Sequence, residues 1–223
     1  MKKVIALSVC LLFGLASLTG CTANEAPFEE KTHTADPGEI TGVQIDVKDR
    51  KIEVEPSADG KIHLTYSESS KDFYEIDTEG GTLVMTSASD RDWADYIGEK
   101  ASQKDRTIRL QIPVSGLASL RLTTSNEDLA LPAAHFSDHV SLRVNNGNID
   151  VEGLDVGNAA TLEAKNGSIT GTIIGSYDLF SIQSTVKKGR SNLPERKEDG
   201  EKSLEVAVNN GNIDVDFLKD TTH

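Results

Sequence analysis

The chain has 223 residues, with 36 Asp and Glu against 23 Lys and Arg, which gives a formal net charge of −13 at pH 7. Such an acidic surface repels polyanions as a whole, so we expect no nucleic-acid partner. The length fits one medium-sized domain, and Cys10 and Cys21 are the only cysteines.

Residues 1–20 are predicted to be a lipoprotein signal peptide. Lys2 and Lys3 precede an apolar run that is short for a membrane span, and the run ends in Leu-Thr-Gly before Cys21. The thiolate of Cys21 is the group there that can be alkylated by a diacylglyceryl donor. We therefore expect lipidation at Cys21, membrane attachment through that lipid, and an extracytoplasmic location.

Residues 21–39 are polar and hold two prolines, which predicts a lipid-anchored flexible tether. From residue 40 to residue 218 the apolar residues alternate, and the turns are made of Asn, Asp and Gly, which is typical of strands. Residues 219–223 form a short tail. Loss of the signal removes two lysines, so the mature charge moves from −13 to −15, and no disulfide is expected.

One template recurs along this domain, with two apolar positions on each side of a four-residue turn. The hexapeptide NNGNID occurs twice, at 145–150 and 209–214, and KNGS at 165–168 and SNED at 125–128 occupy related positions. The copies begin at residues 122, 142, 162, 184 and 206, so their spacing is 20, 20, 22 and 22 residues. Such regularity predicts an internal repeat.

The repeat predicts an all-β, right-handed β-helix or β-solenoid with coils of about 20–22 residues. In that fold Val144, Ala164, Val186 and Val208 form one inward column, and Gly147 and Gly211 have positive φ at the corners. The alternative is a β-sandwich or meander, in which each Asn-Gly closes an antiparallel hairpin. The constant repeat length favours the solenoid.

Residues 86–106 interrupt the alternation with a charged segment that contains the only tryptophan. We interpret this segment as an insertion with a short helix that covers one end or side of the solenoid. Trp93 and Tyr96 would form this plug, or, if exposed, a stacking platform for sugars.

The segments RLQIP (109–113), SLRLTTSNEDLAL (119–131), LRVNNGNIDVEG (142–153), LEAKNGSITGT (162–172) and LEVAVNNGNIDVDF (204–217) resemble the bacterial putative-adhesin family. These are exported or membrane-tethered proteins of unknown biochemical role, akin to the head domains of some auto-transporter adhesins. The resemblance covers roughly residues 40–218. It implies a right-handed β-helix-like domain and no catalytic residues.

The candidate ligand surface consists of Trp93, Tyr96, Asn146, Asn166 and Asn210. The three asparagines are expected to stack as an amide ladder at one corner, which serves either turn chemistry or glycan binding. His135 and His139 lie in a segment without the further ligands of a zinc site, and the outward Asp150 and Asp214 lack the calcium-repeat pattern. We expect no metal, no cofactor and no disulfide.

These features predict a cell-surface lipoprotein that presents a non-catalytic, adhesin-like domain for binding or envelope structure, with an envelope glycan or protein as partner. One alternative is an envelope-stress or signalling accessory that binds a membrane partner. A second is a carbohydrate-active enzyme on a β-helix, which would need converging carboxylates in a groove. No nucleophile motif of a hydrolase is present in the sequence.

Overall fold

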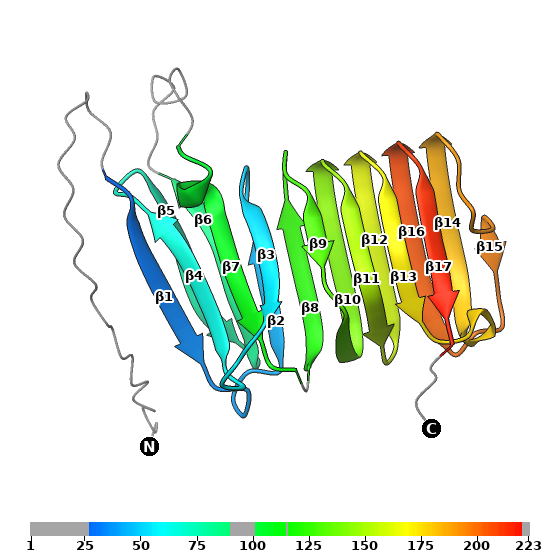
Figure 1. The fold of residues 1–223 in the computed structure, drawn as a ribbon, viewed down its shortest axis with the longest axis horizontal. Coiled ribbons are helices and arrows are strands. Elements are labelled where there is room, and N and C mark those ends of the chain that lie inside the picture. Colours follow the sequence, from blue (N-terminus) through cyan, green and yellow to red (C-terminus); the bar gives the residue numbers. More distant parts are fainter. Residues whose placement is uncertain (1–26, 90–100, 115, 220–223) are drawn as a thin grey trace.

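The computed structural model describes residues 27–89, 101–114 and 116–219 of the chain. This part is all-β, with seventeen strands connected into one strongly curled sheet (Figure 1). The only helical elements described are two 3-10 turns, η2 (Lys104–Arg106) and η3 (Tyr177–Leu179). No helix in the described residues is both long enough and apolar enough to span a membrane.

Most strands lie in two rows of parallel neighbours. The first row contains, in spatial order, β6 (Thr82–Ser89), β2 (Gly42–Asp46), β8 (Leu117–Thr124), β10 (Ala134–Asn146), β12 (Ala159–Asn166), β16 (Lys202–Asn210) and β14 (Phe180–Lys188). The second row contains β7 (Thr107–Ile112), β3 (Lys51–Pro56), β9 (Leu129–Leu131), β11 (Ile149–Val156), β13 (Ile169–Ile174) and β17 (Ile213–Leu218). We call one first-row strand and the segment that follows it in the second row a rung.

The Asn-Gly turns connect the two rows and do not close hairpins. Val144 on β10 pairs in parallel with Ala164 on β12, and Ile149 on β11 pairs in parallel with Ile169 on β13. The parallel stacking predicted from the repeat is therefore confirmed, and the hairpin alternative is wrong at these turns. The physical reason is that every copy presents the same inward pattern, so copies bury their apolar positions best when they stack in register.

The spatial order of the rungs differs from their order in the chain. β16 lies between β12 and β14, so the column expected to run Val144, Ala164, Val186, Val208 actually runs Val144, Ala164, Val208, Val186. At the other end, β2 likewise lies between β6 and β8. β2 and β16 are therefore each covered by a parallel strand on both sides, which protects them from fraying.

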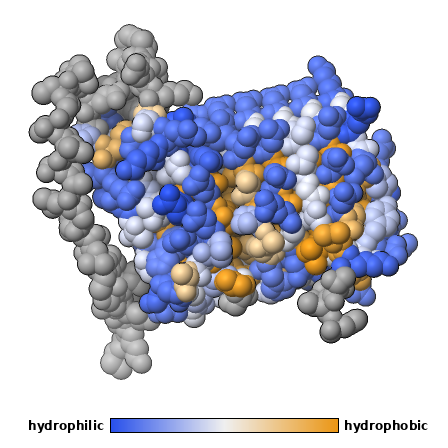
Figure 2. Space-filling model, viewed as in Figure 1, coloured by the Kyte–Doolittle hydropathy of each residue, from blue (hydrophilic) through white to orange (hydrophobic). Residues whose placement is uncertain are grey.

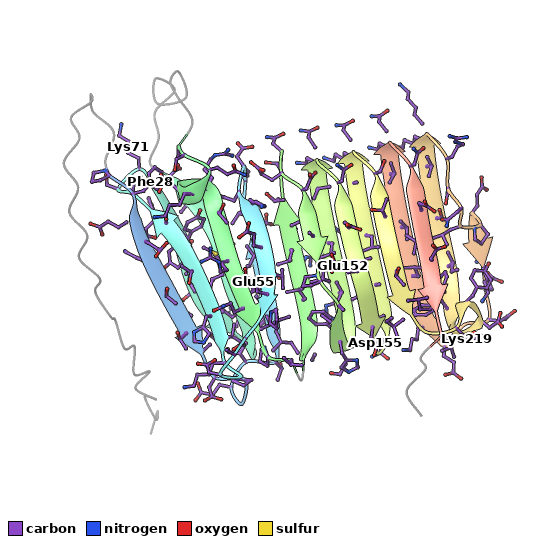
Figure 3. The ribbon with its side chains drawn as sticks, viewed as in Figure 1. Phe28, Glu55, Lys71, Glu152, Asp155 and Lys219 are labelled. Atoms are coloured by element: carbon purple, nitrogen blue, oxygen red, sulfur yellow. The ribbon has the colours of Figure 1, made fainter. Side chains whose placement is uncertain are left out.

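Alternating inward side chains from both rows form one continuous apolar core. Val144, Ala164 and Val208 are at most 3% exposed, whereas Val186 is only partly buried because it lies on the outermost rung. The opposite side chains are polar, and Glu55 and Glu152 lie on the outward face of the second row (Figure 3). The alternation of strands thus supplies both core and surface.

Antiparallel strands cover the N-terminal end. β1 (Glu29–Ala35) pairs with β4 (Ile62–Glu68), β4 pairs with β7, and β5 (Asp72–Glu79) pairs with β6. Residues 29–35 were expected to belong to the tether, and this expectation is wrong because their backbone completes the edge of β4. Residues 86–89 likewise extend β6 and do not belong to an insertion.

The C-terminal end is covered by residues 189–201. The short strand β15 (Arg196–Lys197) pairs with Ile182 and Gln183 of β14, and Leu193 is buried against the core. The side chain of Asn192 exchanges hydrogen bonds with the backbone of Val215. This segment occupies backbone groups that an uncovered terminal rung would leave free.

Candidate functional site

The corner where the first row turns into the second is the most regular polar surface of the molecule. Gly147, Gly167 and Gly211 adopt φ of +153°, +153° and +148°. The amide of Gly147 donates to the carbonyl of Asn166, and that of Gly167 donates to Asn210, each at 2.9 Å. The positive φ predicted for Gly147 and Gly211 is confirmed, and the glycines permit a close backbone approach between rungs.

An amide ladder runs along this corner through Asn126, Asn146, Asn166 and Asn210. Asn146 donates to Asn126 at 2.5 Å, Asn166 donates to Asn146 at 2.7 Å, and Asn210 donates to Asn166 at 2.6 Å, each from Nδ2 to Oδ1. The predicted stacking is therefore present. Because the ladder occupies one amide hydrogen and one oxygen lone pair of each inner member, its first role is to hold the rungs in register.

A second ladder lies just beyond the glycines. The backbone amides of Asn148 and Ser168 donate to the side chains of Asp128 and Asn148, at 2.6 and 2.9 Å, and Arg190 continues the series through the side chain of Asn212 at 3.0 Å. These bonds use backbone amides that the turn would otherwise leave without a partner. The two ladders fix the corner as a rigid edge.

A neighbouring row of side chains at the same corner is left available. Asn145, Lys165 and Asn209 immediately precede ladder asparagines, and Lys187 precedes Lys188, which pairs in register with Asn210. The register therefore places these four residues side by side. We call these four residues the corner row. Among the described residues, none of the four side chains has a hydrogen-bond or ion-pair partner, and three of the four residues are exposed, while Asn209 is partly exposed.

The side chains of these rungs project along the upper edge of the molecule in Figure 3, and the same edge is hydrophilic in Figure 2. The corner row alternates in space between an amide and an ammonium group. An amide both donates and accepts hydrogen bonds, and an ammonium group donates three, so the row can recognise hydroxyl groups and anions together. The sequence prediction named the ladder and missed this row.

The N-terminal part of the corner is built differently. Arg50 stands where the rungs of β10, β12, β16 and β14 have glycine. Its side chain is buried, with Nε donating to the Tyr74 hydroxyl at 2.6 Å and an η nitrogen donating to Asp72 at 3.1 Å. Burial lowers the pKa of the Arg50 guanidinium, but the contacts with Tyr74 and Asp72 outweigh burial and raise that pKa overall. Arg50 therefore remains charged and holds β5 to the corner.

A shallow hollow of about 300 Å³ lies near the N-terminal end, between residues of β1, β3, β4, β7 and the segment before β7. Tyr66 lines this hollow. Burial of its phenol, and to a smaller extent the electrostatic influence of Glu68 and Tyr74, raises the pKa of Tyr66 to about 12. Two of the three cations that line it are engaged, since Lys51 lies 2.7 Å from Glu53 and Arg109 lies 3.8 Å from Glu55, whereas Lys104 has no ion-pair partner among the described residues. The hollow therefore offers less free binding capacity than the corner row.

The remaining candidate residues are dispersed. His135 and His139 lie on β10 and not in a loop, and their Nδ1 atoms contact different carboxylates, Asp155 at 2.7 Å and Asp138 at 3.0 Å. A hydrogen bond with Asn158 and, as the next largest cause, one with His139 lower the pKa of the Asp138 carboxyl group. No group of three His, Cys, Asp or Glu side chains suited to a metal ion occurs in the described ranges.

Three of the predicted sites cannot be placed. Cys21, Trp93 and Tyr96 lie outside the residues that the structure describes. The outward acids Asp150 and Asp214 are exposed on β11 and β17, as the alternation predicts. Arg143 contacts Glu163 at 3.3 Å across neighbouring rungs.

The family model described as Toastrack DUF4097 matches residues 40–185. Among solved structures, one named a putative cell adhesion protein, from Clostridium sporogenes, has 13% identity and a TM-score of 0.56, with 86% of this chain and 100% of that chain covered. A structure named a putative adhesin, from Bacteroides fragilis, has 13% identity and a TM-score of 0.31, covering 85% and 97% of the two chains. No curated protein sequence matches the chain.

Proposed function

Because the chain belongs to the Toastrack DUF4097 family, we propose that it is an adhesin-like lipoprotein that binds at the outer cell envelope without catalysis. The observation that carries this proposal is the rigid corner, on which exposed, unengaged polar side chains are repeated from rung to rung. A rigid repeated surface suits multivalent contact with a repetitive partner. The fold is also similar to that of the Clostridium sporogenes structure named a putative cell adhesion protein.

The proposal includes the lipid anchor at Cys21 and the signal peptide over residues 1–20. It also includes the right-handed winding of the coils that the family resemblance implies. In this arrangement the domain begins at β1, which leaves a tether of residues 21–28 between the lipid and the first strand. The partner is an envelope glycan or protein, and the domain works without cofactor.

Binding is tested by sedimentation with isolated cell envelopes. The full-length protein, purified in non-ionic detergent, is expected to co-sediment with envelope material and to reach saturation. A lipoprotein of equal charge but unrelated fold, with the same kind of lipid anchor, is the control, so that binding by the domain is measured above anchoring by the lipid. Recovery of the chain in the supernatant at every envelope concentration would refute the proposed function.

The substitution Cys21→Ser tests the anchor. We expect the variant to be lost from the membrane fraction and to lack the added mass of the diacylglyceryl group, because serine has no thiolate to be alkylated. Fractionation and intact mass measure the outcome. Cys10→Ser is the matched control and should change neither. An unmodified mass for wild-type protein, or membrane retention of the variant with a lipid still attached, would contradict lipidation at Cys21.

A further inference from the structure

We infer that the corner row binds a linear, hydroxyl-rich polyanion, such as a glycan that carries carboxylate or phosphate groups. This inference rests on the proposed function and names the chemical class of its partner. The chain as a whole is strongly acidic, so a locally basic surface requires a reason. The corner of rungs β10, β12, β16 and β14 is such a surface.

The charge at this corner is of one sign. The four turns at 145–148, 165–168, 209–212 and 187–190 contain Lys165, Lys187, Lys188 and Arg190 and no acidic residue. All four cations are exposed, and within the described part of the chain none of them forms a salt bridge. By contrast, Lys31, Lys51 and Arg106 are each paired with a carboxylate. The corner therefore holds positive charge that no neighbour neutralises.

Acidic residues only border this surface. Asp128 marks its N-terminal limit and accepts the backbone amide of Asn148. Asp150 and Asp214 lie on the second row, each two residues beyond its turn, and Glu163 is paired with Arg143 on the first row. These carboxylates surround the corner and favour a ligand that follows its length over one that spreads across both faces.

The spacing selects an extended ligand. Lys165 and Lys187 are separated by the rung of Asn209, so their backbones are roughly 9–10 Å apart at the usual strand separation. Asn145 and Asn209 each contribute an unengaged amide beside a lysine. An extended chain with alternating anionic and hydroxyl groups can meet each of these side chains in turn.

A membrane surface fits this corner less well. Stable interfacial binding needs an apolar face beside the cations, and the corner turns contain Asn, Lys, Gly, Ser and Arg only. The exposed Tyr177 and Leu179 follow the C-terminal end of β13, and the exposed Leu218 is the last residue of β17, so all three lie at the strand ends away from these turns. The corner is therefore assigned to a polymer and not to lipid headgroups.

The test compares two charge-matched variants of the full-length protein in non-ionic detergent. One carries Lys165→Glu, Lys187→Glu and Lys188→Glu at the corner. The control carries Lys61→Glu, Arg121→Glu and Lys219→Glu, which are exposed elsewhere, and both variants move the formal charge from −13 to −19. The probes are hyaluronan, poly(glycerol phosphate), neutral dextran, and vesicles of equimolar phosphatidylcholine and phosphatidylglycerol.

Wild-type protein is expected to bind hyaluronan, poly(glycerol phosphate) or both, with affinity that falls as salt rises, and to bind dextran much more weakly. The corner variant should lose roughly tenfold or more in affinity, while the control keeps most of it. The preferred polyanion distinguishes carboxylate from phosphate. A melting temperature equal to that of the wild-type protein shows that each variant is folded.

The inference is overturned if wild type binds neither polyanion, if both variants lose affinity equally, or if the vesicles are bound and the polymers are not. The proposed function is judged separately by the envelope assay. A corner variant that still co-sediments with envelopes as wild type does would leave envelope binding intact and refute the role of the corner. Loss of envelope binding by the corner variant alone supports both.

Discussion

Val208→Asp is expected to lower the free energy of unfolding by about 4 kcal/mol or more. Val208 is 1% exposed and lies on the central column between Ala164 and Val186. A carboxylate there would lose its hydration without gaining a partner, since the neighbouring side chains of the column are apolar. Denaturant unfolding followed by circular dichroism measures the change.

The same substitution at an exposed valine is the control. Val114 is 78% exposed, so Val114→Asp should change stability by no more than about 0.5 kcal/mol. The loss in the Val208 variant should also shrink at acid pH, because burial raises the pKa of the new carboxyl and the neutral form is cheaper to bury. Equal stability of the two variants would mean that Val208 is not in the core.

Gly167→Ala is expected to cost at least about 3 kcal/mol, although it adds one methyl group. The Cβ atom would lie 1.9 Å from the carbonyl oxygen of Gly147, and Gly167 adopts φ of +153°. The rungs would have to separate at the corner, which would also weaken the bond from the Gly167 amide to Asn210. Thermal and denaturant unfolding report the loss.

Gly60→Ala separates strain from crowding. Gly60 has φ of +74°, but no heavy atom would lie within 4 Å of its Cβ. The free energy of unfolding of this variant should therefore fall only by the cost of holding alanine at positive φ, about 1–2 kcal/mol. If Gly167→Ala lowers the free energy of unfolding no more than Gly60→Ala does, the rungs do not approach each other closely at the corner.

Much of the fold could be predicted from the sequence because the repeat is local. Alternation determines which side chains face inward, and Asn-Gly at a fixed offset determines where the chain turns. Together with the constant repeat length, which favoured stacked coils over hairpins, those two features predicted the parallel register of Val144 with Ala164 and the amide ladder. They also predicted the outward position of Asp150.

The order of the rungs could not be predicted in the same way. Each copy presents nearly the same inward pattern, so Val208 fits beside Ala164 as well as Val186 does. The choice depends on the course of residues 194–201, which lie beyond the copy that begins at residue 184, pair with β14 through β15 and carry no repeat signal. The strand β1 was missed for a related reason, since Glu29–Ala35 is polar and gains its stability from an edge that exists only in the folded chain.

The arrangement of the corner row could not be predicted from the sequence either, because it depends on that same order of the rungs. Along the chain its members run Asn145, Lys165, Lys187, Asn209, with the two lysines adjacent. In space Asn209 lies between them, which produces the alternation of amide and ammonium groups. The ladder asparagines were visible from sequence, but only their hydrogen bonds show that the free groups lie one residue earlier.

Insertion of the last copy of the repeat between its two predecessors forms the corner row. Disulfide trapping tests it with two pairs of outward positions. Thr161 on β12 pairs in register with Glu205 on β16, and Glu205 pairs with Gln183 on β14. Neighbouring strands are about 4.8 Å apart, within the reach of a disulfide, whereas strands two apart are roughly 9–10 Å apart and beyond it.

Under mild oxidation, Thr161→Cys/Glu205→Cys should therefore form an intramolecular disulfide, and Thr161→Cys/Gln183→Cys should not. Peptide mapping by mass spectrometry identifies the bond, since the native Cys10 and Cys21 lie in a separate N-terminal peptide. Rapid cross-linking of the Thr161 and Gln183 pair, with none between Thr161 and Glu205, would show that the rungs stack in chain order and that β16 does not lie between β12 and β14.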